Sequence, residues 1–332
     1  MRSEPDVPPT QSAEYAFQHC FDDFDEFTAA AIAWDLDFRP LRRPSASTRL
    51  TQIGGAEFQV GHAQLGCHCD QTGSTPTGFR TYAVPLSHSS PINWAQQAVG
   101  DDTLLVFGSD RELAAATLPG FDVYTVSLSE AALNACEAGH RLLDFTPASA
   151  TLVNCGRLDM DRLRARIAAL LGAALAPDRA ADSPAIPPGL PAELAGLLWE
   201  AIAGASGQPS PRLAVRSRSR VLTRARDWLL ANPESALSVT AMSRETGVPE
   251  RTLRRAFVEH FGVPPKEYLR AMRLISVRRR LQQPETAERC IAEVAGAFGF
   301  WHASQFAADY RRLFGELPSK TLAQSPCTTK CA

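Results

Sequence analysis

One pattern occurs twice in the last third of the chain, at residues 238–262 and 291–315. The copies read SVTAMSRETGVPERTLRRAFVEHFG and IAEVAGAFGFWHASQFAADYRRLFG. Each copy has a glycine after its first apolar stretch, Gly247 in the first and Gly299 in the second. The two copies align with each other apart from one extra residue near Trp301 in the second. A repeated supersecondary unit constrains a fold more strongly than local propensities do. Each copy predicts two short helices joined by a glycine turn, which is a helix-turn-helix.

The charge is divided unevenly along the chain. Residues 216–320 carry 19 Lys and Arg against 11 Asp and Glu, a net charge of +8, whereas residues 1–215 have a net charge of -11 and the whole chain -2. A basic module joined to an acidic one is expected when only the basic module approaches phosphates. This division favours double-stranded DNA as the partner of the C-terminal part.

Other features exclude several classes of protein. The length of 332 residues suits about two domains. The longest apolar run, residues 165–176, contains Arg166 and stops at Pro177, short of the roughly 20 residues that span a bilayer. The N-terminus has no apolar signal-peptide core, and eight cysteines without such a signal do not indicate a disulfide framework. We expect a cytoplasmic protein without membrane contact.

Short strand-like segments separated by Gly, Pro and Ser run from about residue 34 to residue 127. Their spacing predicts an antiparallel sandwich or barrel. The candidate strands are Ser47–Ile53, Glu57–Leu65, Gly78–Leu86, Pro91–Trp94, Thr103–Phe107 and Phe121–Ser127.

Helical patterns flank these strands. Residues 17–27, FQHCFDDFDEF, predict a short amphipathic helix, and Ser129 is a candidate N-cap for the next helix. A longer helix is expected over 159–175, with one apolar stripe that could dock on the β-rich part or pair with its copy in a second subunit. In the C-terminal part, helices are expected over 217–231 and 264–281, the second connecting the two repeats.

The second helix of each repeat has a predicted DNA-reading face. Its apolar positions must point to the core, which leaves the polar positions for base edges. The candidates in the first repeat are Glu250, Arg251, Thr252, Arg254 and Arg255, and those in the second are His302, Ala303, Ser304, Gln305 and Ala308. Arginine suits guanine, glutamine suits adenine and alanine can touch thymine methyls, so the first helix should dominate guanine recognition and the second should favour A·T steps. Candidates for phosphate contacts are Lys266, Arg270, Arg273 and the run Arg278, Arg279 and Arg280.

These residues resemble a known family. The stretch 299–315, GFWHASQFAADYRRLFG followed by ELPS, is similar to the signature of the AraC/XylS family of bacterial transcription regulators, and RTLRRAF and PPKEYLRAMRL fit the same pattern. The GFWH form is similar to the subgroup that contains ethanolamine-operon regulators. Pro249 departs from the serine that is frequent before the first reading helix, and it supplies no capping hydroxyl.

The resemblance implies an architecture and a function. It implies an α+β multidomain protein, with a β-rich, cupin-like or sandwich N-terminal effector and dimerisation domain over 1–205, a linker at 206–215 and an all-α DNA-binding domain over 216–323. We expect a transcription activator that binds promoter or operator DNA as a homodimer, responds to a small-molecule effector and acts on RNA polymerase. Phe79, Tyr82 and Trp94 are guesses for the effector pocket.

One cluster supports an alternative. His62, Cys67 and Cys69 could bind zinc or copper, which would make the N-terminal half a metal or redox sensor or a metal-dependent enzyme. Alternation along a strand, however, would turn Cys67 and Cys69 away from His68. There is no Gly-rich phosphate loop, metalloprotease pair or Gly-x-Ser-x-Gly elbow. We therefore expect no catalytic site, no bound metal and no cofactor.

Overall fold

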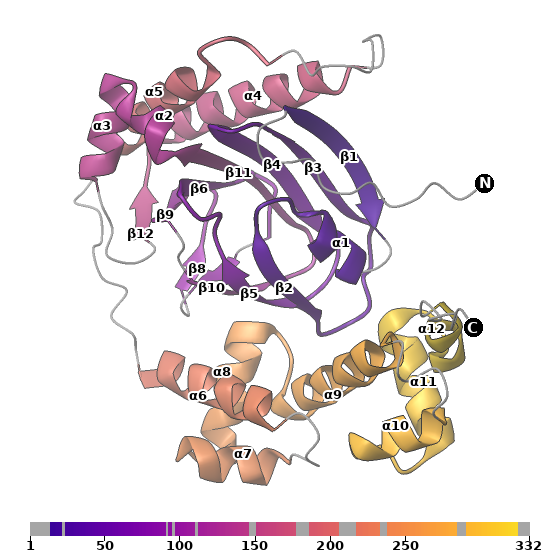
Figure 1. Ribbon diagram of the computed structural model, residues 1–332. Helices are drawn as coiled ribbons and strands as arrows, with labels where there is room; N and C mark the ends of the chain where they lie inside the picture. Colours follow the sequence, from indigo (N-terminus) through magenta and orange to yellow (C-terminus); the bar gives the residue numbers. More distant parts are fainter. Residues whose placement is uncertain are drawn as a thin grey trace.

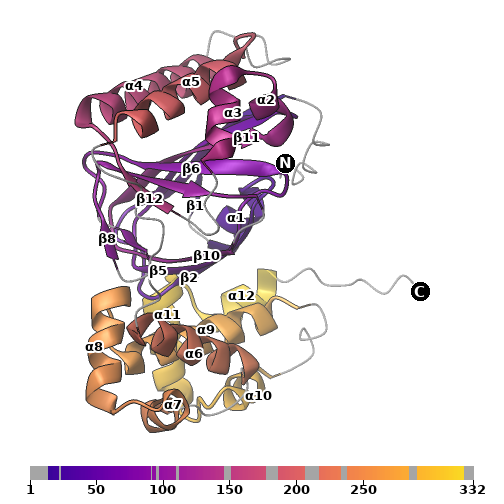
Figure 2. The same cartoon turned by 90° about the vertical axis from the view of Figure 1, so that its left-hand side faces the viewer.

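A β-rich N-terminal part lies against an all-helical C-terminal part in the computed structural model (Figures 1 and 2). The structure describes residues 14–21, 24–90, 92–94, 97–109, 112–145, 151–176, 186–205, 217–232, 238–283 and 290–324. This is the α+β architecture that the sequence predicts; the predicted linker, 206–215, lies outside the described residues. Among the described helices, none is long and apolar enough to cross a bilayer.

The larger of two antiparallel sheets has the strand order β1-β3-β4-β11-β6-β9-β12. Its strands are β1 (Tyr15–Phe21), β3 (Thr48–Gly54), β4 (Phe58–Leu65), β6 (Phe79–Pro85), β9 (Thr103–Phe107), β11 (Phe121–Ser129) and β12 (Thr151–Asn154). Successive side chains on a strand point to opposite faces. On β9, Leu104 joins an apolar cluster shared with the covering helices, whereas Leu105 joins a cluster between the sheets. Burial on both faces explains why β9, TLLVF, is apolar at four of its five positions.

The smaller sheet has the order β2-β5-β10-β7-β8 and lies nearer the C-terminal part (Figure 1). Its strands are β2 (Asp35–Pro40), β5 (Cys69–Ser74), β7 (Ile92–Trp94), β8 (Gln97–Val99) and β10 (Glu112–Thr117). Phe38 and Ala115 contribute to the cluster between the sheets, whereas Ala116 belongs to the core of the C-terminal part. The smaller sheet is therefore the layer through which the two parts touch.

The six predicted strands are confirmed, as β3, β4, β6, β7, β9 and β11. The helix predicted over residues 17–27 is wrong in its first half, because Tyr15–Phe21 pairs along β3 and only Phe24–Ala30 (α1) is helical. Phe17 and Phe21 are four residues apart, a spacing that fits one face of a helix and also one face of a strand. Backbone pairing with β3, which the sequence pattern does not contain, decides between the two.

Helices cover the outer face of the larger sheet (Figure 2). They are α2 (Glu130–Asn134), α3 (Glu137–Asp144), α4 (Arg157–Ala174) and α5 (Leu190–Ala203). Ser129 caps α2 as predicted, its Oγ accepting a hydrogen bond from the backbone N–H of Ala132 at 3.0 Å. The apolar stripe of α4, including Leu163 and Ile167, is buried in the cluster beneath these helices. Of the two alternatives for this helix, docking on the β-rich part is the one observed.

The C-terminal part contains both predicted helix-turn-helix units around one core. Its helices are α6 (Ser217–Ala231), α7 (Val239–Thr246), α8 (Glu250–Phe261), α9 (Pro265–Leu281), α10 (Ile291–Ala297), α11 (Ala303–Phe314) and α12 (Pro318–Gln324). Met242 and Phe257 of the first unit, Tyr268 of α9 and Val294 and Tyr310 of the second unit belong to a single buried cluster. Because this core is continuous, α9 holds the two units at a fixed separation.

Candidate functional site

The first helix-turn-helix is formed by α7 and α8, with Gly247 at the turn. Gly247 has a φ of 72°, a left-handed conformation that favours glycine, and its N–H donates to the carbonyls of Ser243 and Arg244. Ser238 caps the start of α7, accepting from the N–H of Ala241 at 3.1 Å. Pro249 precedes α8 and makes no side-chain cap, as its chemistry requires. The turn therefore fixes the direction in which α8 leaves α7.

The exposed face of α8 carries all five residues predicted for it. Glu250, Arg251, Thr252, Arg254 and Arg255 are exposed, whereas the apolar residues between them are buried. Two of the five are already held by neighbours, since Glu250 accepts from Thr240 Oγ1 at 2.7 Å and Arg255 Nε donates to Glu259 at 2.6 Å. Arg251 and Arg254 form no ion pair with any residue that the structure describes. These two guanidinium groups are therefore the ones free to meet a base edge.

The second helix-turn-helix, α10 and α11, presents a surface of different chemistry. Gly299 has a φ of 80° at its turn. The exposed residues at the start of α11 are those predicted, His302, Ala303, Ser304, Gln305 and Ala308. None of these five side chains belongs to a lysine or an arginine. The two units thus share a buried skeleton but offer arginines in one case and small or amide side chains in the other.

The residues predicted to contact phosphates differ in their surroundings. Lys266 is exposed, Arg270 lies 3.6 Å from a carboxylate oxygen of Asp309, and the guanidinium of Arg273 lies over the ring of Phe300 at 5.5 Å from its centre. Burial, with a contribution from Arg270, lowers the pKa of Arg273. Lys266 and Arg270 therefore remain better placed for an external anion than Arg273.

All three arginines of the run 278–280 have partners within the protein: Arg280 donates to Gln283 at 2.6 Å, and the other two form ion pairs. Arg278 is buried and donates to Glu316 at 2.7 Å, with Asp25 at 3.6 Å. Arg279 forms an ion pair with Asp37 of β2. These contacts fasten the end of α9 to the segment between α11 and α12 and to the β-rich part, so both of these guanidinium groups are already held within the protein.

Comparisons with known proteins agree on the identity of this helical part. A family described as a helix-turn-helix domain matches residues 242–324. A XylDLEGF operon transcriptional activator of Pseudomonas putida is 39% identical over 93 residues, which are 28% of this chain and 29% of that protein. The HTH-type transcriptional activator RhaS of Pectobacterium atrosepticum is 32% identical over 98 residues, 30% of this chain and 34% of that protein.

A solved structure is similar over the same part. It is a transcriptional regulator from Chromobacterium violaceum, described as containing an AraC-type DNA-binding domain. The sequence identity is 31%, the match covers 32% of this chain and 94% of that chain, and the TM-score is 0.31. By its family match and its sequence identities, the C-terminal part is an AraC-type helix-turn-helix domain. The chain spans about a third or less of the two curated relatives named above, so these matches concern the AraC-type domain alone. The resemblance to ethanolamine-operon regulators stays a prediction.

A buried polar triad joins the AraC-type domain to the smaller sheet. The carboxylate of Asp70, on β5, is fully buried; one oxygen accepts from Arg226 Nη2 of α6 at 2.6 Å and the other from the Tyr268 hydroxyl of α9 at 2.7 Å. The guanidinium of Arg226 also lies over the ring of Phe261. Burial and the charge of Asp70 raise the pKa of Tyr268 well above its ordinary value. Tyr268 therefore stays a neutral phenol at physiological pH and donates a hydrogen bond to the carboxylate of Asp70.

Exposed ion pairs surround this triad. Arg42, just after β2, donates to Glu267 of α9 at 2.8 and 3.2 Å, and Arg279 pairs with Asp37. Apolar contact comes from Leu41, which is buried in the core of the AraC-type domain. The triad, these pairs and Leu41 together form what we call the domain seam.

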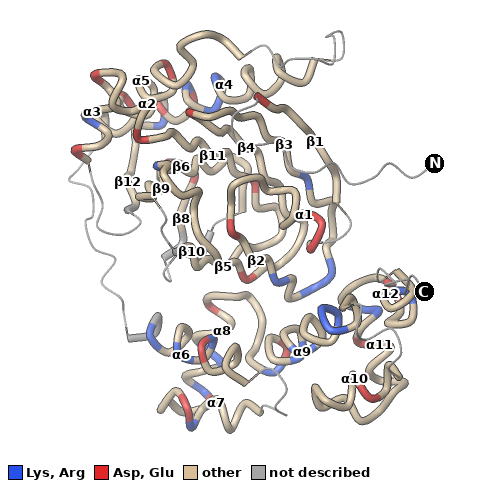
Figure 3. Tube along the Cα trace, viewed as in Figure 1, with Lys and Arg blue, Asp and Glu red and all other residues tan. Residues whose placement is uncertain are grey.

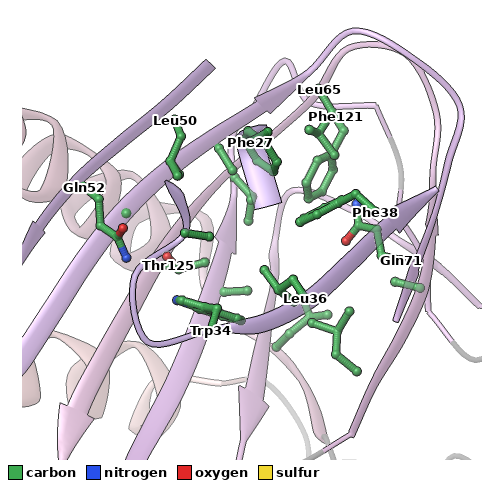
Figure 4. Close-up of a pocket in the computed structure, with 18 of the residues that line it drawn as sticks. Phe27, Trp34, Leu36, Phe38, Leu50, Gln52, Leu65, Gln71, Phe121 and Thr125 are labelled. Atoms are coloured by element: carbon green, nitrogen blue, oxygen red, sulfur yellow. The ribbon is translucent and has the colours of Figure 1, made fainter. Parts of the chain in front are cut away.

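The β-rich part encloses a cavity of about 90 Å³ between its two sheets (Figure 4). Apolar side chains from both sheets and from α1 make most of its wall, among them Phe27, Trp34, Leu36, Phe38, Leu65, Leu105, Phe107 and Phe121. The polar side chains that line it are Gln52, Gln71 and Thr125, and among the residues that the structure describes no charged side chain does so. A concave apolar wall with a few polar groups is typical of small-molecule sites.

Three residues were guessed for the effector pocket, and the two whose side chains the structure describes lie outside this cavity. Phe79 and Tyr82 do not line the cavity, and the side chain of Trp94 lies outside the described residues. Tyr82 is fully buried in the cluster beneath the helices, whereas its neighbour Ala83 faces the cavity. The guess for Tyr82 is therefore wrong for this cavity, because the alternation along β6 sends it to the opposite face.

The residues of the metal-site alternative are not brought together. His62 Nε2 lies 2.6 Å from Asp122 and its ring contacts Tyr124, on the helix-covered face of the larger sheet. Cys67 and Cys69 are buried in the cluster between the sheets. Within the described part of the chain, no group of three or more His, Cys, Asp or Glu is arranged to hold a metal ion. Burial raises the pKa of Cys69 well above its ordinary value, which makes it an unreactive thiol.

His260 gives the AraC-type domain a predictable pH dependence. Burial, with a contribution from Arg226, lowers the pKa of His260 to about 4. In the unfolded chain the imidazole takes up its proton near pH 6.5. Between pH 6.5 and pH 4 the unfolded state therefore binds more protons than the folded state, and the free energy of unfolding decreases as the pH is lowered. We expect the contribution to be complete above about pH 6.5 and about 3 kcal/mol to be lost as the pH falls to about 4. The test is the unfolding temperature as a function of pH. The variant His260→Phe should lose this pH dependence, whereas the control His140→Gln, which replaces an exposed imidazole, should keep it.

Proposed function

We propose that this protein is a sequence-specific DNA-binding transcription regulator, an activator, controlled by a small neutral effector held between its two sheets. The observation that carries the proposal is the pair of exposed reading faces on α8 and α11, fixed to one core by α9. Two such helices suit major grooves on successive turns of one DNA face, roughly 34 Å apart. The named relatives of the AraC-type domain are transcriptional activators, which supports the sign of the regulation.

The cavity suggests the chemistry of the effector. A charged ligand would lose its hydration and find no counter-charge in the wall, because none of the lining side chains is ionised. Gln71 donates its amide N–H to Thr117, and Gln52 exchanges hydrogen bonds with the backbone of Ile32. The carbonyl oxygen of Gln71 and the hydroxyl of Thr125 remain to orient a ligand. A compact aromatic or aliphatic molecule with one or two hydrogen-bonding groups fits this wall best.

The wall of the cavity is also part of the domain seam. On β2, Leu36 and Phe38 face the cavity and Asp37 between them pairs with Arg279. On β5, Gln71 faces the cavity and Asp70 beside it binds Arg226. A ligand that moves these strands must therefore also act on the contacts that hold the AraC-type domain. In a homodimer, this would change how the two subunits present their reading helices to a promoter. The regulator would act in the cytoplasm, on RNA polymerase at that promoter.

A pair of variants on one strand tests the effector site. Ala83→Leu should fill the cavity, and Tyr82→Phe changes the next residue on the opposite face. We expect a panel of neutral aromatic alcohols and amides to contain compounds that raise the unfolding temperature of the wild type, since a ligand at 100 times its Kd adds about 2.7 kcal/mol. Tyr82→Phe should keep this response and Ala83→Leu should lose it. Equal responses in both variants would place the effector outside the cavity.

A further inference from the structure

A second, very different hollow lies outside the β-rich part, at its junction with the AraC-type domain. It is a groove of about 520 Å³ between the segment that follows β2 and the helices α9 and α11. Five basic side chains from three separate elements line it: Arg42, Arg43, Lys266, Arg270 and Arg312. Figure 3 shows the basic stretch after β2 close above α9. The charges of two parts of the chain that are far apart in sequence therefore meet in one hollow.

Acidic side chains neutralise only part of this charge. Glu267 holds Arg42 at 2.8 Å, and Asp309 holds Arg312 at 2.7 Å with Arg270 at 3.6 Å. In the described part of the chain, no other acidic residue lines the groove. Five cations against two carboxylates leave an excess of three positive charges.

Arg43 and Lys266 account for most of the excess. Within the part of the chain that the structure describes, neither forms an ion pair, and both are exposed at the groove. Arg43 belongs to the β-rich part but reaches the end of α11, where a Cβ placed on Gly315 would lie 3.0 Å from its Nη2. Lys266 lies in the first turn of α9. The two unneutralised cations thus come from opposite sides of the domain seam.

We propose that this groove binds phosphate groups, with Arg43 and Lys266 as direct ligands and Arg42 and Arg270 as flanking charges. Phosphate suits the site because a group carrying up to two negative charges offsets most of the excess, and both guanidinium and ammonium groups bind its oxygens. Two sources share this chemistry: the backbone of bound DNA and a small molecule that carries phosphate. In either case the β-rich part, whose net charge is otherwise strongly negative, supplies a phosphate ligand of its own.

The DNA source rests on the proposed function, whereas the small-molecule source does not. Binding of inorganic pyrophosphate to the full chain tests the groove without any DNA. If the protein bound no DNA at all, the proposed function would fail and the pyrophosphate measurement would still decide the groove.

The test compares the wild type with the double variant Arg43→Ala/Lys266→Ala. The charge-matched control is Arg157→Ala/Arg162→Ala, two exposed arginines of α4 in the β-rich part. Unfolding temperatures are measured in pyrophosphate and in sodium chloride of equal ionic strength. Affinities for a random-sequence duplex and for a selected preferred duplex are measured over a range of salt concentrations.

Either source has a distinct signature. A pyrophosphate-specific rise in unfolding temperature that the groove variant loses and the control keeps supports a site for free phosphate. A fall in the salt slope by about 0.9 for each lost contact, equal on both duplexes and absent in the control, supports contact with the DNA backbone. If the groove variant matches the control in both measurements, the proposal is wrong.

Discussion

Replacing Asp70 with alanine is expected to lower the free energy of unfolding by about 3–5 kcal/mol, because it leaves the guanidinium of Arg226 buried without its counter-charge. Only 12% of the Arg226 side chain is exposed, and its partner carboxylate is fully buried. The Tyr268 hydroxyl loses its acceptor in the same step. Urea denaturation of the full chain, followed by tryptophan fluorescence, measures the change.

A matched exposed pair controls for charge alone. Glu267→Gln breaks the ion pair with Arg42, in which the Arg42 side chain is 47% exposed and that of Glu267 is 36% exposed. This substitution should lower the free energy of unfolding by less than about 1 kcal/mol. Asp70→Asn can still accept from Tyr268 but removes the negative charge, so its loss should fall between the other two. Similar losses for Asp70→Ala and Glu267→Gln would show that the buried triad does not stabilise the domain seam.

The AraC-type domain could be predicted almost completely from the sequence. Its signal is local: the turn glycines, the apolar positions at helical spacing and the repetition of both fix where helices begin, end and face. Even the exposed face of α8 follows, since Leu253 and Phe257 must be buried. What the sequence does not give is the engagement of Arg255 with Glu259 and of Arg278 with Glu316, which depends on side-chain geometry.

The smaller sheet is where the prediction from sequence is weakest. The sequence pattern predicts none of β2, β5 and β10, because their outward positions carry charged residues such as Asp37 and Asp70 that look like loop residues. Both carboxylates form ion pairs with arginines of the AraC-type domain. In β5, Gly73 has a φ of 144° and a Cβ there would lie 1.9 Å from the carbonyl oxygen of Asp35, so a turn-like glycine occurs within a strand. Strands that are completed by another domain cannot be recognised from their own pattern.

The cavity was missed for the same reason. The strands β2, β5 and β10 provide Phe38, Gln71 and Ala115, so the wall could not be assembled without them. The signal that was present is the alternation on β6, which separates Tyr82 from Ala83. Alternation along a strand places small residues such as Ala83 on the face that leaves space for a cavity. Large aromatic residues such as Tyr82 fill the space on the opposite face.

Arg251→Ala and Arg254→Ala should each reduce the preference for a selected DNA sequence over random DNA by about 5- to 150-fold, corresponding to about 1–3 kcal/mol for a lost arginine–guanine pair. A preferred sequence is first selected from a random duplex pool with the wild-type protein. Fluorescence anisotropy then measures the affinity of each variant for the preferred and the random duplex at one fixed salt concentration. Relaxed selection at individual G·C positions would identify the base that each arginine reads.

Arg255→Ala is the matched control on the same helix, because Glu259 already holds that guanidinium at 2.6 Å. Its effect on the preference should be smaller than that of either reading arginine. Gln305→Ala, on α11, should weaken selection at A·T positions and leave G·C positions unchanged. If Arg251→Ala and Arg254→Ala weaken binding to both duplexes by the same factor, these arginines contact phosphates and the first unit does not read bases through them. The difference between the two repeats would then be a difference in charge and not in sequence recognition.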